Sequence, residues 1–348
     1  MNIKERIQAF WHGDQPDEIP YTIYQNEWRH TASDPAWDAM YADGLGVTWH
    51  VPTYRTIRHE VEARDWEVDE NGHHLRYQVL HTPEGDVSAY WQDDWQMKYF
   101  LETAADYRVM QFICEHTEIL PDYDTYLHRA REFPPYVIPH PVIGRTPLQV
   151  ILVDYAGLQG FSTQLVDCGD EIRRLYKAML NNFRRIVEVV AGGPGYYISN
   201  LENFTAESLG PRRYREFLLP VYEECFPILH AAGKIVGSHY DGRTASCKNL
   251  IAGAPIDLIE SLTPPPEGDL TLAEARAAWP DKLFWSNINV GVYDLPHNQI
   301  RDIVLERAAQ AAPDGRLLAF QVSELYPENW KQSMPAVLKA LHETRRST

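Results

Sequence analysis

Short apolar segments alternate with helical patterns along most of the chain. Where helices are predicted, as over 170–190, apolar residues recur at helical spacing, Asp170 can cap the start, and Gly192 ends the pattern. Eight short apolar runs are predicted as strands, at 19–24, 44–50, 136–143, 196–200, 234–242, 258–262, 283–288 and 317–323. Strands that alternate with helices are typical of parallel sheets. The pattern therefore predicts an α/β fold, a (β/α)8 TIM barrel, as one domain over 1–348. A doubly wound sheet is the alternative, although no GxGxxG follows an early strand.

The stretch 55–100 follows a different pattern. Polar and apolar residues alternate there in short segments, which are separated by Asp-Glu-Asn-Gly at 69–72 and Thr-Pro-Glu-Gly-Asp at 82–86. Alternation interrupted by tight turns is typical of antiparallel hairpins. We expect a β-hairpin insertion that decorates the barrel near the N-terminal third of the chain.

Composition narrows the class of partner. The 348 residues carry a formal net charge of −17, so nucleic acid and anionic membrane surfaces would repel the protein at long range. No segment is long and apolar enough to span a membrane, and the first residues carry charges where a signal peptide needs an apolar core. The four cysteines show no CxxC spacing. These features predict a soluble, cytoplasmic protein.

Candidate chemistry lies where the predicted strands end, because TIM barrels carry their active sites at the carboxyl ends of the strands. The strand 234–242 ends in His239 and Asp241, which point to the same side since side chains alternate along a strand. Imidazole and carboxylate groups together suit a divalent metal such as zinc. Glu202 and Glu324, which follow other strands, are the candidates to complete that metal site. His239, Asp241 and Glu202 are also the candidate catalytic residues.

Further polar and aromatic residues follow the same strand ends. Those predicted to contact a small substrate are Tyr24, Trp28, Trp49, Asn203, Asn287 and Gln321. The aromatic residues among them fit core packing equally well. His50 and Glu260 also fall at strand ends, whereas His140, between two prolines, is interpreted as a hydrogen-bonded core histidine. No GxSxG, P-loop or HExxH motif occurs, so the usual signatures of esterases, nucleotide binding and zincin proteolysis are absent.

These residues and their order resemble the uroporphyrinogen decarboxylase superfamily, in particular its branch of cobalamin-dependent methyltransferases. The resemblance spans nearly the whole chain and is carried by the segments 2–20, 211–220, 230–234, 239–242, 264–276 and 327–329, together with Asn287. It implies a (β/α)8 barrel. The decarboxylases have an arginine-rich loop after the first strand, which holds a substrate with many carboxylates. Here that region, 24–30, contains the single Arg29.

The methyltransferase branch places zinc on a His-x-Cys motif and a later cysteine. In this sequence Asp241 stands at the position of the first cysteine, and Glu324 lies near the second. An oxygen-rich site fits an oxygen-linked methyl donor better than a thiol acceptor, with the metal polarising the leaving oxygen. The resemblance therefore implies a methyltransferase that moves a methyl group between a small substrate, such as a methoxylated compound, and a corrinoid supplied by a partner protein. A metal-independent decarboxylase of a small carboxylic acid and a non-catalytic ligand-binding barrel remain as alternatives.

Overall fold

The computed structural model describes residues 1–25, 34–322 and 328–345. They form two compact units. The first unit comprises Met1–Thr53, Tyr123–Gly144 and Gly193–Thr348, and the second comprises Tyr54–Asp122 and Arg145–Gly192. The predicted single-domain boundary, 1–348, stays a prediction.

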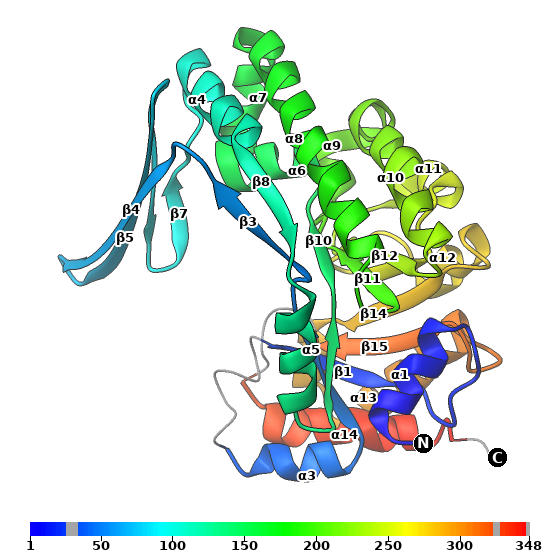
Figure 1. Cartoon of the computed structure of the whole chain (residues 1–348). Coiled ribbons are helices and arrows are strands. Elements are labelled where there is room, and N and C mark those ends of the chain that lie inside the picture. Colours follow the sequence, from blue (N-terminus) through cyan, green and yellow to red (C-terminus); the bar gives the residue numbers. More distant parts are fainter. Residues whose placement is uncertain (26–33, 323–327, 346–348) are drawn as a thin grey trace. The chain divides into compact units, whose positions relative to one another are not determined.

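The first unit is built on a parallel sheet that closes into a barrel (Figure 1). Its strands pair in the order β10-β11-β12-β13-β14-β15-β1-β2-β9. β9 and β10 are the two halves of one strand, interrupted at Pro141, and they pair with β2 and β11 respectively. This divided strand joins both ends of the sheet, so the eight predicted strands and the (β/α)8 barrel are confirmed. The strand bounds are β1 (Tyr21–Tyr24), β2 (Leu45–His50), β9 (Val137–His140), β10 (Val142–Gly144), β11 (Tyr197–Asn200), β12 (Ile235–His239), β13 (Leu258–Leu262), β14 (Leu283–Ile288) and β15 (Leu318–Val322).

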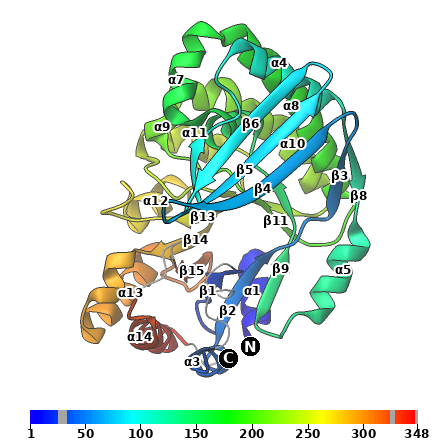
Figure 2. The same ribbon diagram turned by 90° about the vertical axis from the view of Figure 1, so that its left-hand side faces the viewer.

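Helices surround these strands in the first unit (Figure 2). They are α1 (Ile3–Trp11), α3 (Ala36–Ala42), α5 (Tyr123–Glu132), α9 (Ala206–Arg213), the π-helix η2 (Tyr214–Leu218), α10 (Leu219–Ala231), α11 (Lys248–Gly253), α12 (Leu272–Ala278), α13 (His297–Ala311) and α14 (Trp330–His342), with short 3-10 turns η3 (Ala245–Cys247) and η4 (Val290–Asp294). No helix among the described residues is long and apolar enough to cross a membrane.

Helix α1 closes the amino end of the barrel with apolar side chains. Asn2 and Glu5 form a capping box that starts the helix. Ile7, Phe10 and Trp11 on its buried face belong to one apolar cluster with inward-facing strand residues, including Ile138, Leu258, Leu283 and Trp285. This end of the interior is therefore apolar, which leaves the carboxyl end for polar chemistry.

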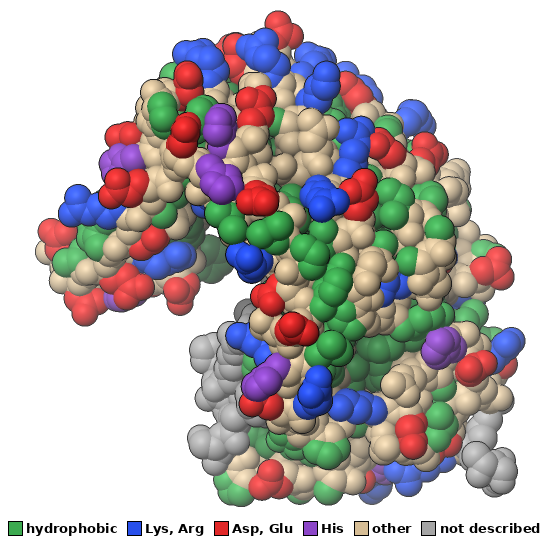
Figure 3. Space-filling view, viewed as in Figure 1, with side chains coloured by type: hydrophobic (Ala, Val, Ile, Leu, Met, Phe, Trp, Pro, Cys, Tyr) green, Lys and Arg blue, Asp and Glu red, His purple; other side chains and the backbone are tan. Residues whose placement is uncertain are grey.

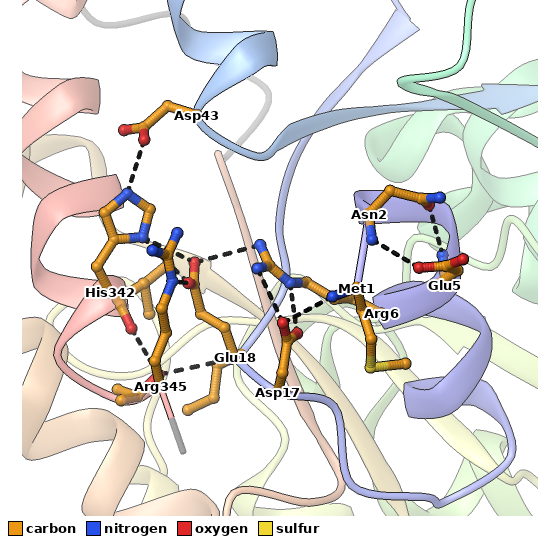
Figure 4. A network of polar contacts seen from close by, with 12 residues as sticks. Met1, Asn2, Glu5, Arg6, Asp17, Glu18, Asp43, His342 and Arg345 are labelled. Carbon is orange, nitrogen blue, oxygen red and sulfur yellow. Dashed lines mark hydrogen bonds and ion pairs between the residues drawn. The ribbon is translucent and has the colours of Figure 1, made fainter. Parts of the chain in front are cut away.

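A polar network ties the two ends of the first unit together (Figure 4). Glu18, which is 3 % exposed, is paired with Arg6 of α1, with His342 at the end of α14, and with Arg345. A buried carboxylate is costly unless it is paired, so these contacts hold the C-terminal helix against the first strand. The same closure appears in the sheet, where β1 pairs with β15.

The second unit contains the predicted hairpins. β4 (Glu62–Glu70), β5 (His73–Thr82), β6 (Gly85–Gln92) and β7 (Trp95–Lys98) form an antiparallel sheet, and β3 (Tyr54–Arg58) pairs with β8 (Thr117–Pro121). Asn71 and Gly72 both have positive φ between β4 and β5, as a tight hairpin turn requires. The hairpin insertion is confirmed. The helices of this unit are α4 (Ala104–Glu115), α6 (Pro147–Gln149), the π-helix η1 (Val150–Ala156), α7 (Gly157–Asp167) and α8 (Gly169–Ala191).

Charged side chains of both signs lie next to one another on the molecular surface. On the face drawn in Figure 3, acidic and basic residues are interspersed. On α8, for example, Arg174 pairs with Glu171 at 2.8 Å, and Arg185 pairs with Glu188 at 3.2 Å. Such exposed pairs contribute little to stability.

Candidate functional site

A buried histidine lies between two carboxylates at the carboxyl end of the barrel. His239 is the last residue of β12. Its Nδ1 is 3.9 Å from Oε1 of Glu260 on the neighbouring strand β13, and its Nε2 is 3.8 Å from Oδ2 of Asp241. Glu260 is 1 % exposed and His239 is 7 % exposed. The structure therefore brings together the predicted pair His239 and Asp241, and adds Glu260.

Glu260 is the centre of the hydrogen-bond network. Its Oε2 accepts hydrogen bonds from the Tyr197 hydroxyl at 2.9 Å and from the Ser199 hydroxyl at 2.8 Å, both on β11. Its Oε1 accepts a longer bond, 3.4 Å, from Tyr24 on β1. These donors stabilise the ionised carboxylate within a largely enclosed interior.

A local irregularity in β13 brings two consecutive residues into this interior. The register of β13 against β14 shifts between Glu260 and Leu262, and Ser261 has a φ of +61°. A bulged residue breaks the alternation of side chains along a strand. As a result Ser261 also takes part in the network, through the Tyr24 hydroxyl at 2.9 Å. Positive φ in a non-glycine residue is costly, and such strain concentrates at functional sites.

Three of the predicted substrate-contacting residues belong to the same network. Gln321 donates from Nε2 to the Tyr24 hydroxyl at 2.8 Å and to the Ser261 hydroxyl at 3.2 Å. The Ser261 hydroxyl donates to Asn287 Oδ1 at 3.4 Å, and the Asn287 amide donates to Thr263 at 2.9 Å. The structure thus assembles Tyr24, Asn287 and Gln321, although they lie far apart in the sequence. Their contact with a substrate stays a prediction.

A glycine in β12 makes room for this arrangement. A Cβ added at Gly237 would lie 2.5 Å from the Tyr197 hydroxyl oxygen. Any larger residue would therefore displace the hydroxyl that donates to Glu260.

The two carboxylates determine the charge of the histidine. Burial lowers the pKa of His239, but the Asp241 and Glu260 carboxylates outweigh burial and raise this pKa well above its ordinary value. Burial alone would raise the pKa of Glu260, but the adjacent imidazolium lowers it. The site therefore holds one positive charge between two negative charges.

Asp241 is held in place by Asn203. With its amide nitrogen turned towards the carboxylate, Asn203 donates to Asp241 Oδ2 at 2.9 Å and to Oδ1 at 3.2 Å. Asn203 has a φ of +53°, a conformation that asparagine tolerates better than most residues. The backbone N–H of Phe204 donates to the carbonyl of His239 at 3.1 Å, which ties this loop to the end of β12.

Glu202 is bound to a different set of residues. It is fully buried, and its Oε1 accepts a hydrogen bond from the Tyr222 hydroxyl of α10 at 2.9 Å. The Tyr240 hydroxyl donates to Tyr222 at 3.2 Å, and the Tyr214 hydroxyl lies 3.0 Å from that of Tyr240. Because Tyr240 stands between His239 and Asp241 in the chain, this tyrosine network supports the end of β12 from the other side of the strand.

The remaining predicted residues have these positions. Trp49 is buried on β2 and packs on Phe133 with ring centroids 4.9 Å apart. Trp28 and Glu324 lie outside the described residues. Within residues 1–25, 34–322 and 328–345 there is no group of three or more His, Cys, Asp or Glu side chains placed to hold a metal ion. The proposed zinc set of His239, Asp241, Glu202 and Glu324 stays a prediction.

The sequence analysis placed Glu260 at a strand end but gave it no role, and it did not select Ser261, Tyr197 and Ser199. One signal for Glu260 was available, because an ionisable residue in the middle of the apolar run 258–262 is rarely buried without a partner. The bulge at Ser261 left no comparable signal.

Comparison with known proteins adds information about the fold. The chain is similar in fold to a methyltransferase from Methanosarcina mazei. The TM-score is 0.56 at 10 % sequence identity, and the match covers 99 % of this chain and 98 % of that one. A B12-independent methionine synthase from Shewanella sp. W3-18-1 matches with a TM-score of 0.43 at 11 % identity, over 90 % of this chain and 86 % of that one. No protein-family model matches the sequence, and no curated protein sequence matches it. Similarity at this level of identity establishes the barrel fold alone.

Proposed function

We propose that this protein transfers a methyl group between a small substrate with an oxygen-linked methyl group and a corrinoid supplied by a partner protein. The observation that carries the proposal is the buried His239 between Glu260 and Asp241 at the carboxyl end of the barrel. The resemblance to the methyltransferase branch and the fold shared with the Methanosarcina methyltransferase support it.

Methyl transfer from oxygen requires positive charge beside the leaving oxygen. In such a transfer the carbon–oxygen bond would break and leave its electron pair on the oxygen, and a corrinoid, when bound, would supply the nucleophile that accepts the methyl group. Protonated His239 donates its Nε2 proton to that oxygen, so an ether leaves as an alcohol or phenol. Glu260 holds the imidazolium from its Nδ1 side, and the neutral imidazole then takes a proton from solvent.

Zinc is the other possible source of this positive charge. His239 Nε2 and Asp241 Oδ2 are 3.8 Å apart, close to the roughly 3.4 Å expected for two ligands of a tetrahedral ion with bonds of about 2.1 Å. Glu260, on the far nitrogen, would then orient the imidazole, as second-shell carboxylates do. A catalytic zinc usually takes three protein ligands, and the described residues provide two here. We therefore assign no step to zinc.

The decarboxylase alternative needs cationic groups for a carboxylate. Arg145, the first residue of the segment Arg145–Gly192 of the second unit, pairs with Asp154 at 3.2 Å. Arg243, after β12, pairs with Glu207 at 3.2 Å on the surface. Both arginines are thus already engaged by carboxylates, and Arg29 lies outside the described residues. These contacts do not favour decarboxylation.

Two measurements on tag-free protein test the proposal. Methylcobalamin formation from methoxyarenes and cob(I)alamin should occur with the wild type and fall at least 100-fold in His239→Ala, because general acid catalysis contributes about 10²-fold or more. Metal analysis of both proteins then separates the two sources of charge. Near-stoichiometric zinc that is lost in His239→Ala would assign the charge to a metal, whereas activity in metal-free protein would assign it to the proton. Absence of methyl transfer with every methoxyarene in both proteins would refute the proposal.

A further inference from the structure

Strand β4 of the second unit is an exposed edge strand. It is the first strand in the sheet order β4-β5-β6-β7, and no strand among the described residues pairs with its outer edge. Each of its residues is exposed. It pairs with β5 over its whole length without a register shift, and it contains no proline. Soluble proteins usually shorten, bend or cover such an edge, because its unpaired backbone groups bind further strands.

One face of this sheet presents apolar side chains next to the edge. Trp66, Tyr77 and Tyr90 are cross-strand partners on β4, β5 and β6. Their rings stack in a row, with centroids 5.1 Å and 5.5 Å apart. Trp66 and Val68 on β4 are each 41 % exposed, and Trp95 on β7 is 78 % exposed. Large apolar side chains that are exposed together mark an interaction surface, whereas single ones are ordinary.

The stacking of these rings limits what can bind to this face. Tyr77 has a neighbouring ring against each of its flat sides, and the guanidinium of Arg64 lies over the Trp66 ring, 5.4 Å from its centroid. A nucleobase or another planar ligand needs an open ring face on which to stack. The row offers ring edges and aliphatic surface instead, and these suit the side chains of another polypeptide.

The other face of β4 carries carboxylates. Because side chains alternate along a strand, Asp65, Glu67 and Asp69 point away from the face that holds Trp66 and Val68. With the glutamates at both ends, the strand has five acidic side chains and one basic side chain. β4 is therefore apolar on one face and acidic on the other.

Basic neighbours balance only part of this charge. His74 on β5 lies 2.8 Å from Asp69 and 3.7 Å from Glu67. Arg76 is the cross-strand partner of Glu67, and its guanidinium lies over the Trp91 ring, 4.0 Å from the centroid. Even with both basic groups charged, the three carboxylates leave this face of the edge with a net negative charge.

The charge pattern opposes pairing of β4 with a second copy of itself. In the antiparallel register centred on Trp66, Glu62 would face Glu70 of the second copy, and Asp65 would face Glu67. A shift of two residues in either direction sets Asp65 or Glu67 opposite its own counterpart. Like charges directly opposite one another destabilise a strand pair. A strand that alternates apolar with basic residues, by contrast, matches both faces of β4.

We propose that the outer edge of β4 binds an extended segment of a partner protein in which apolar and basic residues alternate. The segment adds a strand to the sheet, with its apolar side chains beside Trp66 and Val68 and its basic side chains beside Asp65, Glu67 and Asp69. In strand addition the main-chain hydrogen bonds give affinity, and the alternate side chains give specificity. This interaction goes beyond the proposed methyl transfer and does not depend on it.

Three capped nine-residue peptides test the proposal with the full chain. The first alternates valine with lysine and begins and ends with valine, the second has glutamate in place of lysine, and the third is the lysine peptide with proline at its central valine. By calorimetry at about 50 mM salt, we expect the lysine peptide to bind at least about ten-fold more tightly than the other two. Glutamate reverses the charge, and proline removes a ladder hydrogen bond. Salt at about 0.5 M should weaken binding of the lysine peptide, because it screens exposed charges.

Variants of β4 locate the binding site. Asp65→Lys/Glu67→Lys should reverse the preference, so that the glutamate peptide binds more tightly than the lysine peptide. Trp66→Thr keeps a strand-forming residue and should weaken the lysine peptide without reversing the preference. Asp302→Lys/Glu306→Lys, at exposed positions of α13, makes the same change in net charge and should bind the lysine peptide within about two-fold of the wild type.

The proposal is overturned if the lysine peptide does not bind, if the proline peptide binds equally well, or if Asp65→Lys/Glu67→Lys keeps the wild-type preference. Sedimentation that shows a dimer which Trp66→Thr dissociates would also overturn it, because a second copy would then occupy the edge. Each of these results leaves the proposed methyl transfer untouched, since that activity is measured separately through His239→Ala.

Discussion

Replacing Glu260 with glutamine tests whether that carboxylate controls the charge of His239. The substitution removes a charge 3.9 Å from the imidazole Nδ1 and keeps the shape of the side chain. At an effective dielectric constant of about 20, two unit charges at this separation interact by about 4 kcal/mol, which corresponds to roughly 3 pKa units. Because Asp241 remains on the other nitrogen, we expect the pKa of His239 to fall by about 2 to 3 units in Glu260→Gln.

The direct assay is an NMR titration of the labelled His239 imidazole in chelator-treated protein. Asp257→Asn is the matched control, since Asp257 precedes the same strand at its other end and contacts a different histidine, His230, at 2.8 Å. The control should leave the titration of His239 unchanged. A shift smaller than about 0.5 unit in Glu260→Gln would refute the electrostatic argument.

The same pair makes stability depend on pH in a defined direction. The pKa of His239 is higher in the folded protein than the ordinary value of about 6.5 expected in the unfolded chain. Its contribution to the free energy of unfolding is therefore fully present below about pH 6.5 and is lost as the pH rises through the folded-state pKa. Glu260→Gln should shift this loss to lower pH, which urea unfolding between pH 6 and 10 would detect.

Three further substitutions test the contacts around the site and the closure of the barrel. Gly237→Ala should lower the free energy of unfolding by about 1 to 3 kcal/mol, because its Cβ would lie 2.5 Å from the Tyr197 hydroxyl oxygen. A urea midpoint equal to that of the wild type would contradict this prediction. Tyr222→Phe should lower the free energy of unfolding by about 1 to 3 kcal/mol in the same assay, because it removes a hydrogen-bond donor from the buried Glu202. An unchanged free energy of unfolding would show that the carboxylate finds another partner. Burial opposes ionisation of Asp17, but hydrogen bonds from Arg6 of α1 lower the pKa of Asp17 to about 2. Asp17→Asn should therefore lower the free energy of unfolding by about 1 to 2 kcal/mol at pH 7. The difference from the wild type should narrow as the pH falls from about 4 to 2, and a difference that does not depend on pH would exclude this linkage.

The sequence predicted the barrel because each strand is a short apolar run whose ends are marked by polar or turn residues. His239 and Asp241 followed from the same pattern, since a strand that ends in two polar residues two positions apart places them on one side. The strand-end position of Glu260 followed from the same pattern, but its role could not be predicted, because it depends on donors from strands that are remote in sequence, such as Tyr197 and Tyr24. The bulge at Ser261 is set by the packing of neighbouring strands, which local sequence patterns do not encode.

The charges at the carboxyl end of the barrel restrict the substrate independently of the family resemblance. With His239 protonated, Glu260 and Asp241 leave the group with a net charge of −1, so an anionic substrate would be repelled. Under the proposed function, this charge favours a neutral or cationic molecule, to whose leaving oxygen His239 would donate the proton. Methyl transfer from an oxygen-linked donor satisfies these conditions, whereas decarboxylation would bring a carboxylate into the group of charges least suited to hold it.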